Sequence, residues 1–349
     1  MTRPAHHHPA GGFRNPWPNT EPPGFGSLLK WWLERRTSRR PARDPRREIV
    51  PPRVPQFRLA PPDGLAITWL GHSTLLVESG AATVLTDPVF GDYASPIALN
   101  PLRRWTRIPV ALEELPRLDM VLISHSHYDH LDAGTVRRLA ALQPRAVWVC
   151  PLGLGPLLRE FGARTVEEID WWVRLGAGRV WVTATPAQHF SARGPRDRNQ
   201  SLWCGYSIEL GARKVYFAGD TGYHPDFRLI GEKLGPFDAM LLPIGAYEPR
   251  WFMRTMHMNP EEAVRAAIAL HEGAADAADE DLAPPPFPAV VPIHWGTFKL
   301  TDEPMDEPPR RAAEAWRLAG LPEDRFWLLA PGESRTDSNG LAPEPSPAS

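Results

Sequence analysis

One ten-residue stretch, 123–132, restricts the folds open to this chain more than any other part of the sequence. It overlaps the end of the apolar run 120–123 and holds three histidines and an aspartate within six residues, namely His125, His127, Asp129 and His130. A short apolar run that gives way to polar residues is typical of a buried strand ending in a loop, and open α/β folds carry their chemistry at such strand ends. The stretch therefore predicts an α/β fold with a functional site in this loop.

The residue types and spacing in this loop favour a metal site. Neutral imidazole nitrogens and carboxylate oxygens suit zinc and other borderline first-row divalent ions. Alternation in an extended loop turns His125 and His127 to the same side, and Asp129 and His130 then point toward a second position. One such loop can serve two ions about 3.5–4 Å apart, as in two-metal hydrolases. A histidine-rich surface loop is the alternative, and the position directly after a buried strand argues against it.

Three further strand ends carry residues of the same kind. The strand pattern 214–218, which is apolar from Val215 on, leads to Asp220, the strand pattern 179–185 leads to His189, and Pro292-Ile293 leads to His294. Each of these signals is weak alone. A dinuclear site needs about seven protein ligand atoms, and the chain supplies that number: His125, His127, Asp129, His130, His189, Asp220 and His294.

Length and charge limit the class of protein. The 349 residues allow one large domain or two ordinary ones, and 42% hydrophobic residues can form a substantial core. The net charge of −2 is uneven, because residues 1–60 carry 12 Lys/Arg and 4 Asp/Glu, a net of +8. The basic end is the part suited to an anionic surface. We expect no nucleic acid partner.

Compartment and membrane insertion follow from what the sequence lacks. No run of about 18 apolar residues occurs, so we expect no membrane-spanning helix, and the N-terminus lacks the apolar core of a secretory signal. Cys150 and Cys204 offer no disulfide framework, which favours a reducing compartment. We therefore expect a cytoplasmic protein that can lie peripherally on a membrane.

The N-terminal segment 1–60 is rich in proline and arginine and contains a predicted amphipathic helix over 25–36. Its apolar stripe, at helical spacing, consists of Phe25, Leu28, Leu29, Trp32 and Leu33. Twelve residues do not form a stable isolated helix in water, so the stripe must dock on something. Two alternatives stay open: the body of the protein itself, or a membrane surface contacted through residues 25–47, whose arginines follow the helix.

From residue 65 the pattern changes to short strands with tight turns, over 66–70, 74–78 and 82–88. A helix is predicted over 133–142, and a second group of strands includes 179–185 and 202–208. Two groups of strands separated by helices predict an α/β fold of two packed sheets with helices outside, in a domain spanning 61–335. We expect the acidic segment 272–286 to be an inserted solvated loop and 336–349 to be a disordered tail.

At this point the ligand set resembles that of the metallo-β-lactamase fold, an αββα sandwich of two mixed β-sheets flanked by helices, with the metal site at one edge. The closer resemblance is to the N-acylphosphatidylethanolamine-hydrolysing phospholipase D family. It extends from Asn15-Pro16-Trp17-Pro18 to about Arg335, and its distinctive blocks are 68–72, 124–132, 217–223, 243–253 and 294–298.

The resemblance implies two zinc ions and assigns the ligands between them. His125, His127 and His189 would hold one ion, and Asp129, His130 and His294 the other. Asp220 would bridge the two, and Asp129 and Asp220 are the expected catalytic residues. The family's substrate contacts correspond to Tyr128 and His257, although His257 on sequence alone is better explained as a surface histidine.

His72 and the oligomeric state leave alternatives open. His72 lies in a Gly-His-Ser turn, where it either orients a metal ligand from behind or serves the turn alone. The family implies a homodimer, for which the periodicity of this sequence gives no interface.

The implied activity is hydrolysis of N-acylphosphatidylethanolamine to N-acylethanolamine and phosphatidic acid. A metal-bridging hydroxide would attack phosphorus, since bound zinc lowers the pKa of water to about 7. The nearest alternative is a hydrolase of this fold acting on another small ester, such as a lactone or a cyclic or sugar phosphate. A redox di-iron protein would typically carry Glu in place of His127, and a non-catalytic membrane-binding module would not need seven ligands.

Overall fold

The computed structural model describes residues 7–8, 11–37, 49–57, 60, 64–80, 82–279, 281 and 283–337. Two expectations fall largely outside these residues: the arginine-rich run from 38 to 47 and the C-terminal tail from 338. The predicted start of the tail, at residue 336, is too early, however. Residues 336 and 337 belong to strand β13 (Ser334–Asp337), which pairs with β1 (Leu65–Gly71).

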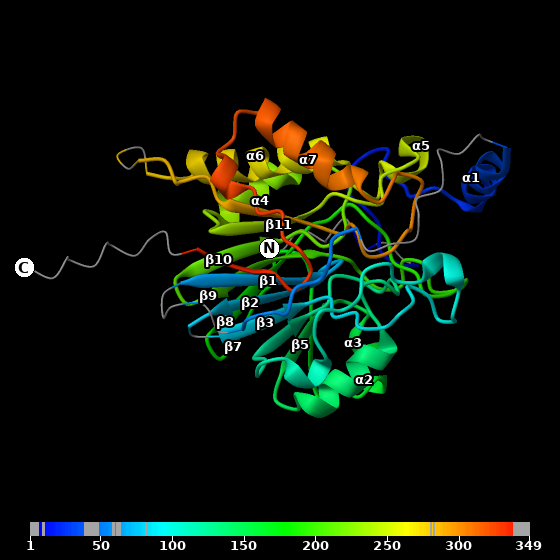
Figure 1. Cartoon of the computed structure of the whole chain (residues 1–349), viewed down its shortest axis with the longest axis horizontal. Coiled ribbons are helices and arrows are strands. Elements are labelled where there is room, and N and C mark those ends of the chain that lie inside the picture. The colour runs from blue at the N-terminus through cyan, green and yellow to red at the C-terminus, as the bar shows by residue number, and fades with distance from the viewer. Residues whose placement is uncertain are drawn as a thin grey trace, which may run out of the picture.

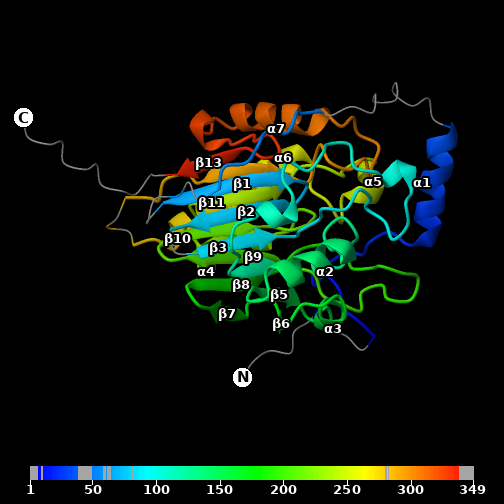
Figure 2. The ribbon, with the colours of Figure 1, turned by 60° about the horizontal axis from the view of Figure 1, so that its bottom comes forward.

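Two mixed sheets form the centre of the molecule (Figure 1, Figure 2). The first has the order β13-β1-β2-β3-β4-β5-β6, in which β2 is Thr74–Ser79, β3 Ala82–Thr86, β4 Met120–Leu122, β5 Val147–Pro151 and β6 Thr165–Ile169. The second has the order β12-β11-β10-β9-β8-β7, comprising β7 (Arg174–Ala177), β8 (Val180–Thr185), β9 (Gly205–Leu210), β10 (Arg213–Phe217), β11 (Ala239–Pro243) and β12 (Ala289–Ile293). Strands β3 to β6 run parallel, as do β10 to β12, and the other pairs are antiparallel.

Helices cover the outer faces of both sheets. Figure 1 shows α2 (Ala133–Leu142) and α3 (Gly155–Glu160) on one side, and α4 (Asp226–Leu234), α6 (Pro260–Asp276) and α7 (Glu307–Leu318) on the other. Helix α1 (Phe25–Thr37) lies at the edge near the short α5 (Arg250–Met253), and the described residues include 3₁₀ helices over Asn100–Leu102, Leu112–Glu114 and Glu323–Arg325. The predicted αββα sandwich is confirmed. Helix α2 has its predicted bounds, whereas β9 begins at Gly205 rather than at 202.

Side chains of the central strands are buried on both faces. In β4, Met120 and Leu122 belong to the core between the sheets, and Val121 packs in a second cluster under α2 and α3. Successive side chains of a strand point to opposite faces, so a strand covered on both sides reads as a continuous apolar run. Polar side chains therefore gather where the strands end, and the site forms there.

Helix α1 forms where the sequence predicts it but docks through a different face. Trp31 is 8% exposed, its ring lies 5.0 Å from that of Phe252, and its Nε1 donates to Asp302 Oδ2 at 2.6 Å. The described members of the predicted stripe, Leu28, Leu29, Trp32 and Leu33, are 45–49% exposed. These four side chains are thus half exposed, whereas the buried contact of the helix with the protein body is made by Trp31. None of the helices in the described part of the chain is long and apolar enough to cross a bilayer.

The expectation that residues 272–286 form a solvated loop is wrong for the first five of them. Helix α6 continues to Asp276, and Gly273 and Ala274 are buried. A Cβ on Gly273 would lie 2.0 Å from the Arg228 carbonyl oxygen of α4, so the glycine permits close packing of the two helices. The small residues of this low-complexity stretch therefore allow α6 to pack closely against α4.

Candidate metal centre

The loop between β4 and α2 is held at both ends by local hydrogen bonds. At its start, the Ser124 N–H donates to Asp87 Oδ1 at 2.7 Å. At its end, Asp132 caps α2 and accepts hydrogen bonds from the N–H groups of Gly134 and Thr135. Capping oxygens satisfy helix N–H groups that have no partner within the helix. The four candidate ligands of the loop are thereby held between a strand end and a helix start.

A first group of three imidazoles converges on one point. Nε2 of His125 lies 2.8 Å from Nδ1 of His127, which lies 3.2 Å from Nε2 of His189. Burial lowers the pKa of His127 to about 3 and that of His189 to about 4, and it holds the pKa of His125 well below its usual value. All three are therefore neutral at pH 7, the form in which imidazole binds a metal.

A second group contains Asp129, His130 and His294, with His72 behind it. Oδ2 of Asp129 lies 3.5 Å from His130 Nε2 and 3.4 Å from His294 Nε2. The same oxygen accepts a hydrogen bond from His72 Nε2 at 2.9 Å. His72 therefore contacts a candidate ligand directly, as an orienting residue must, and it also lies among the donor atoms of this group.

Asp220 lies between the two groups. Its Oδ2 is 3.1 Å from Nε2 of both His130 and His294, and 3.8–3.9 Å from Nε2 of His189 and His125. The preceding Gly219 has φ +60°, and a Cβ there would lie 2.8 Å from Ser124 Cβ. Glycine is needed for the strand-end turn after β10 to approach the histidine loop so closely.

The donor atoms fit divalent metal ions. Among the described residues, His130 Nε2, His294 Nε2 and Asp220 Oδ1 are buried and make no well-aligned hydrogen bond, although both nitrogens lie 3.1 Å from Asp220 Oδ2. A buried polar atom left unsatisfied costs roughly 1–3 kcal/mol, so one such atom on each of three side chains that meet at one centre is unusual for a structural core. Nitrogen and carboxylate oxygen donors in this arrangement suit zinc and related ions. The structure thus brings all seven sequence-predicted ligands together at the edge of the sheets.

Two residues at this centre were not predicted from the sequence. The Asp87 carboxylate accepts hydrogen bonds from Ser124 Oγ at 2.5 Å and from His130 Nδ1 at 2.7 Å. Asn15 hydrogen-bonds both the N–H and the carbonyl oxygen of His189, at 3.2 and 3.1 Å. Asp87 directly follows β3 in a Thr-Asp-Pro sequence, which is a signal of the same kind as that of the candidate ligands. Asn15 gives no local signal.

The expected substrate contacts, Tyr128 and His257, also lie at the site. The Tyr128 hydroxyl donates to the carbonyl oxygen of Arg193 at 3.0 Å, and the Arg193 guanidinium lies 3.9 Å from the centre of the Tyr128 ring. Nδ1 of His257 is 3.8 Å from Asp220 Oδ2, and its side chain is only 12% exposed. The surface position that sequence alone favours for His257 is therefore wrong.

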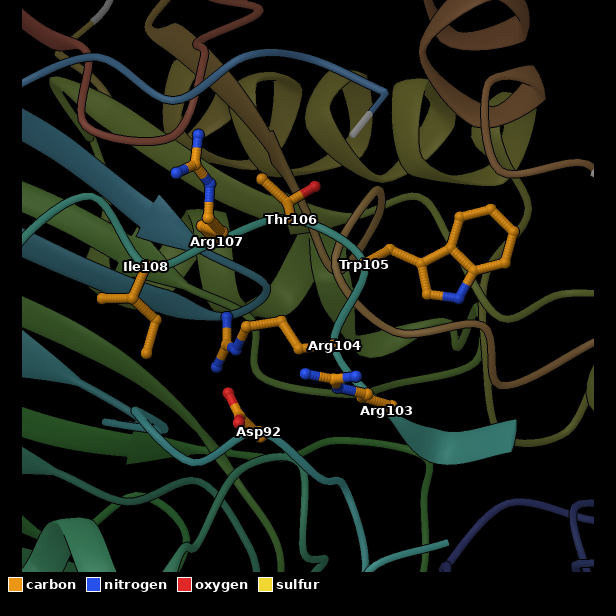
Figure 3. Close-up of a pocket in the computed structure, with 7 residues that line it drawn as sticks. All are labelled: Asp92, Arg103, Arg104, Trp105, Thr106, Arg107 and Ile108. Carbon is orange, nitrogen blue, oxygen red and sulfur yellow. The ribbon is translucent and has the colours of Figure 1, made fainter. Parts of the chain in front are cut away.

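A surface pocket of about 350 Å³ adjoins the loop that carries His294. Its wall contacts that loop through the Trp105 N–H, which donates to Thr297 O, and the Thr106 hydroxyl, which donates to Gly296 O. Figure 3 shows the Arg104 guanidinium near Asp92. The lining contains no candidate metal ligand and consists of Asp92, Arg103, Arg104, Trp105, Thr106, Arg107 and Ile108.

Metal binding to the metal-free protein is expected to release protons. Burial by itself lowers the pKa of His294, but Asp220 and Asp129 outweigh burial and raise it to about 9. Burial also lowers the pKa of His130, but Asp220, Asp129 and Asp87 outweigh it and hold that pKa well above its usual value. Both imidazoles are protonated at pH 7 without metal, whereas a metal ligand must be neutral. The apparent metal affinity should rise with pH toward about 9.

Titration calorimetry checks this expectation. Zinc is titrated into chelator-stripped protein at pH 7 in two buffers of different ionisation enthalpy, and the difference in heat gives the protons released. Release should decrease when the titration is repeated above pH 9, where His294 has already lost its proton. Equal heats in the two buffers at pH 7 would contradict the expectation.

The fold and the site define a class of protein, and the comparisons agree with it. Residues 82–295 match the family described as the Beta-lactamase superfamily domain. A metallo hydrolase from the archaeon Ignicoccus hospitalis has a similar structure, with a TM-score of 0.55, 25% identity, and coverage of 78% of this chain and 98% of that one. This is a metal-dependent hydrolase of the metallo-β-lactamase fold.

Two relatives identify the family within that class. The N-acyl-phosphatidylethanolamine-hydrolyzing phospholipase D 1 of Caenorhabditis elegans is 40% identical over 263 residues, 72% of this chain and 69% of the relative. The mitochondrial enzyme of the same name from Saccharomyces cerevisiae is 34% identical over 251 residues, 70% of this chain and 50% of the relative. The chain belongs to the N-acylphosphatidylethanolamine-hydrolysing phospholipase D family.

Proposed function

We propose that this protein hydrolyses N-acylphosphatidylethanolamine to N-acylethanolamine and phosphatidic acid at a centre of two zinc ions. One observation carries the proposal: seven donor side chains converge in a chain that is 40% identical to a relative named for this reaction. His125, His127 and His189 would hold one ion, Asp129, His130 and His294 the other, and Asp220 both. When bound, such ions polarise phosphoryl oxygens and supply hydroxide near neutral pH.

The protein's own residues fix the orientation of these ligands. Asp87 accepts the Nδ1 proton of His130, which leaves Nε2 facing the centre. The Met256 carbonyl oxygen accepts the Nδ1 proton of His189 at 2.9 Å in the same manner. Such partners select the tautomer and the ring orientation of a metal-binding histidine. His72 restrains Asp129 through its hydrogen bond to Oδ2.

Tyr128 and His257 are the proposed substrate contacts. Tyr128 follows His127 directly in the loop, and its contacts with Arg193 restrain the ring beside the centre. His257 has a buried Nδ1 without a hydrogen-bond partner, 3.8 Å from Asp220 Oδ2. A polar atom in that position is available to a phosphoryl or carbonyl oxygen of the substrate.

The proposed reaction is tested with vesicles that contain N-acylphosphatidylethanolamine. Zinc-loaded protein should form both phosphatidic acid and N-acylethanolamine, measured by mass spectrometry, and a chelator should abolish both products. If neither product forms while a soluble diester is cleaved, the substrate is another small ester, such as a cyclic or sugar phosphate or a lactone, and the lipid assignment fails. Chelator-resistant product would contradict the role of the metal.

We also propose that α1 contacts the membrane surface. Its side chains Leu29 and Leu33 are 46% and 49% exposed, while Trp31 on another face anchors the helix to α5. Half-exposed leucines can bury further apolar area in lipid, and basic residues after the helix would contact anionic headgroups. The basic side of this proposal involves residues 38–47, which lie outside the described residues.

Replacing Leu29 and Leu33 together by glutamine should lower activity on vesicles on the order of tenfold or more, since each ~1.4 kcal/mol of lost binding is a factor of ten. Activity on a soluble diester should stay unchanged. Leu318→Gln on α7, which is 70% exposed, is the matched control and should retain vesicle activity. Equal losses on both substrates would point to damage at the metal centre rather than to lost membrane contact.

We propose further that the protein is cytoplasmic, lies peripherally on the membrane and forms a homodimer. The two cysteines, Cys150 and Cys204, are free and buried, which supports a reducing compartment. The family supports the dimer, and sedimentation analysis of the purified protein tests it.

A further inference from the structure

A second cluster of metal-type donors lies outside the centre described above. Oδ1 of Asp170 is 2.7 Å from His7 Nε2, and Oδ2 of the same carboxylate is 3.2 Å from His8 Nε2. The three ligand atoms all lie within 4.8 Å of one another. Residues 163 positions apart in the chain, His7 and Asp170, are thus brought together by the fold.

Trp171 and the main chain after β6 hold the cluster in place. The His7 ring stacks on Trp171 with centroids 4.1 Å apart and planes 25° apart, and the Trp171 indole donates to Trp203 O at 2.7 Å. Asp170 directly follows β6, and its Oδ1 accepts the Trp171 N–H at 2.7 Å. His7 is 7% exposed, whereas His8 is exposed. The carboxylate and one imidazole are therefore held in place before any ion binds.

The donors of this cluster lie as close together as those of the candidate metal centre. In both groups, one ligand atom from each of three residues lies within 4.8 Å of the other two. Each imidazole nitrogen here faces its own oxygen of the Asp170 carboxylate, at 2.7 Å for His7 and 3.2 Å for His8. Ligands about 2.0–2.1 Å from a tetrahedral zinc lie roughly 3.3 Å from one another. Only small movements would bring these three donors to such an ion.

We propose that His7, His8 and Asp170 form a third metal site, which takes a borderline divalent ion such as Zn²⁺ with water completing its coordination. Two imidazoles and a carboxylate are a donor set that suits zinc, copper and nickel rather than magnesium or calcium. The ion links the N-terminal segment to the end of β6. The inference does not depend on the proposed lipid substrate.

The consequence of this site is a restrained N-terminal segment. The Arg14 N–H donates to His7 O at 3.1 Å, and the next residue, Asn15, hydrogen-bonds both main-chain groups of His189. Trp203 Nε1 also donates to Asn15 Oδ1 at 3.2 Å. An ion at the third site therefore stabilises the segment that holds one ligand-bearing loop of the main centre.

Metal counting distinguishes this site from a simple ion pair between imidazolium and carboxylate. Tag-free, chelator-stripped protein is dialysed against Zn²⁺ at pH 7.5, and the bound metal is measured by mass spectrometry. The wild type should hold one equivalent more than Asp170→Asn and one more than His8→Ala. His271→Ala, a partly buried histidine on α6, is the control and should bind as much as the wild type. In thermal unfolding, Zn²⁺ should raise the unfolding temperature of the wild type and of His271→Ala more than that of either site variant.

The two variants separate the possible failures. Equal metal in wild type and both variants would overturn the proposal. A loss in His8→Ala but not in Asp170→Asn would also overturn it, because histidines of the N-terminal run would then chelate zinc without the folded site. His8 is exposed, so His8→Ala should fold normally, and circular dichroism of Asp170→Asn checks that its loss of metal is not a loss of fold. Because the result is a difference of one equivalent, it is readable whether or not the main centre is filled.

Discussion

Replacement of Asp220 by alanine is expected to abolish metal-dependent hydrolysis while the fold persists. Oδ2 of Asp220 is the one described carboxylate oxygen within 3.9 Å of donor nitrogens in both groups, from His125 and His189 on one side and His130 and His294 on the other. Its loss removes the link between the two positions. The reduction in kcat/KM should exceed roughly 100-fold, the upper end of the 10–100-fold cost typical of losing a residue that only supports a ligand.

The fold should survive this change for an electrostatic reason. Asp220 is a main cause of the raised pKa values of His130 and His294, so without it both imidazoles become neutral more readily and no unpaired buried charge remains. Circular dichroism and thermal unfolding check the fold, and elemental analysis checks the metal content. Asp276→Ala, an exposed carboxylate at the end of α6, is the control and should be fully active. Wild-type turnover in Asp220→Ala would refute the site assignment.

Replacement of Asp87 by alanine should lower both metal affinity and stability, although no ligand is removed. The Asp87 carboxylate is fully buried and accepts hydrogen bonds from the Ser124 N–H, the Ser124 hydroxyl and His130 Nδ1. Without it, the His130 ring loses the partner that selects its tautomer, and we expect metal affinity to fall about 10–100-fold. Each buried donor left without an acceptor costs roughly 1–3 kcal/mol of unfolding free energy.

A matched variant separates these two effects. Asp238, which directly precedes β11, accepts hydrogen bonds from the Lys214 N–H and from the Arg213 guanidinium, and it contacts no candidate ligand. Asp238→Ala should therefore be destabilised with unchanged metal affinity, measured by competition with a chromogenic chelator. Asp87→Asn keeps one acceptor oxygen and should lie between alanine and wild type. If Asp87→Ala bound metal as tightly as the wild type, His130 would not depend on this carboxylate for its orientation.

Local sequence alone was enough to predict the two-sheet fold and the seven donors. Strands covered on both faces are apolar over their buried residues, so β4, β12 and the part of β10 from Val215 on are recognisable as runs, and a polar side chain directly after them lies at a sheet edge. Imidazole and carboxylate in that position carry their chemistry in the residue type. The family resemblance, carried by consecutive residues such as 124–132, followed from the same local information.

What only the tertiary structure decided depends on contacts between distant residues. Asn15 and His189 are 174 positions apart, and Asp87 and His130 are 43 apart, so neither partner marks the other in sequence. The side of α1 that docks depends on where α5 and Asp302 lie, because the helix periodicity alone identifies an apolar stripe but not its neighbour. His257, likewise, becomes part of the site only because its loop folds back onto Asp220. Donor identity is a local property of the chain, whereas orientation, burial and partner choice arise only when the chain is folded.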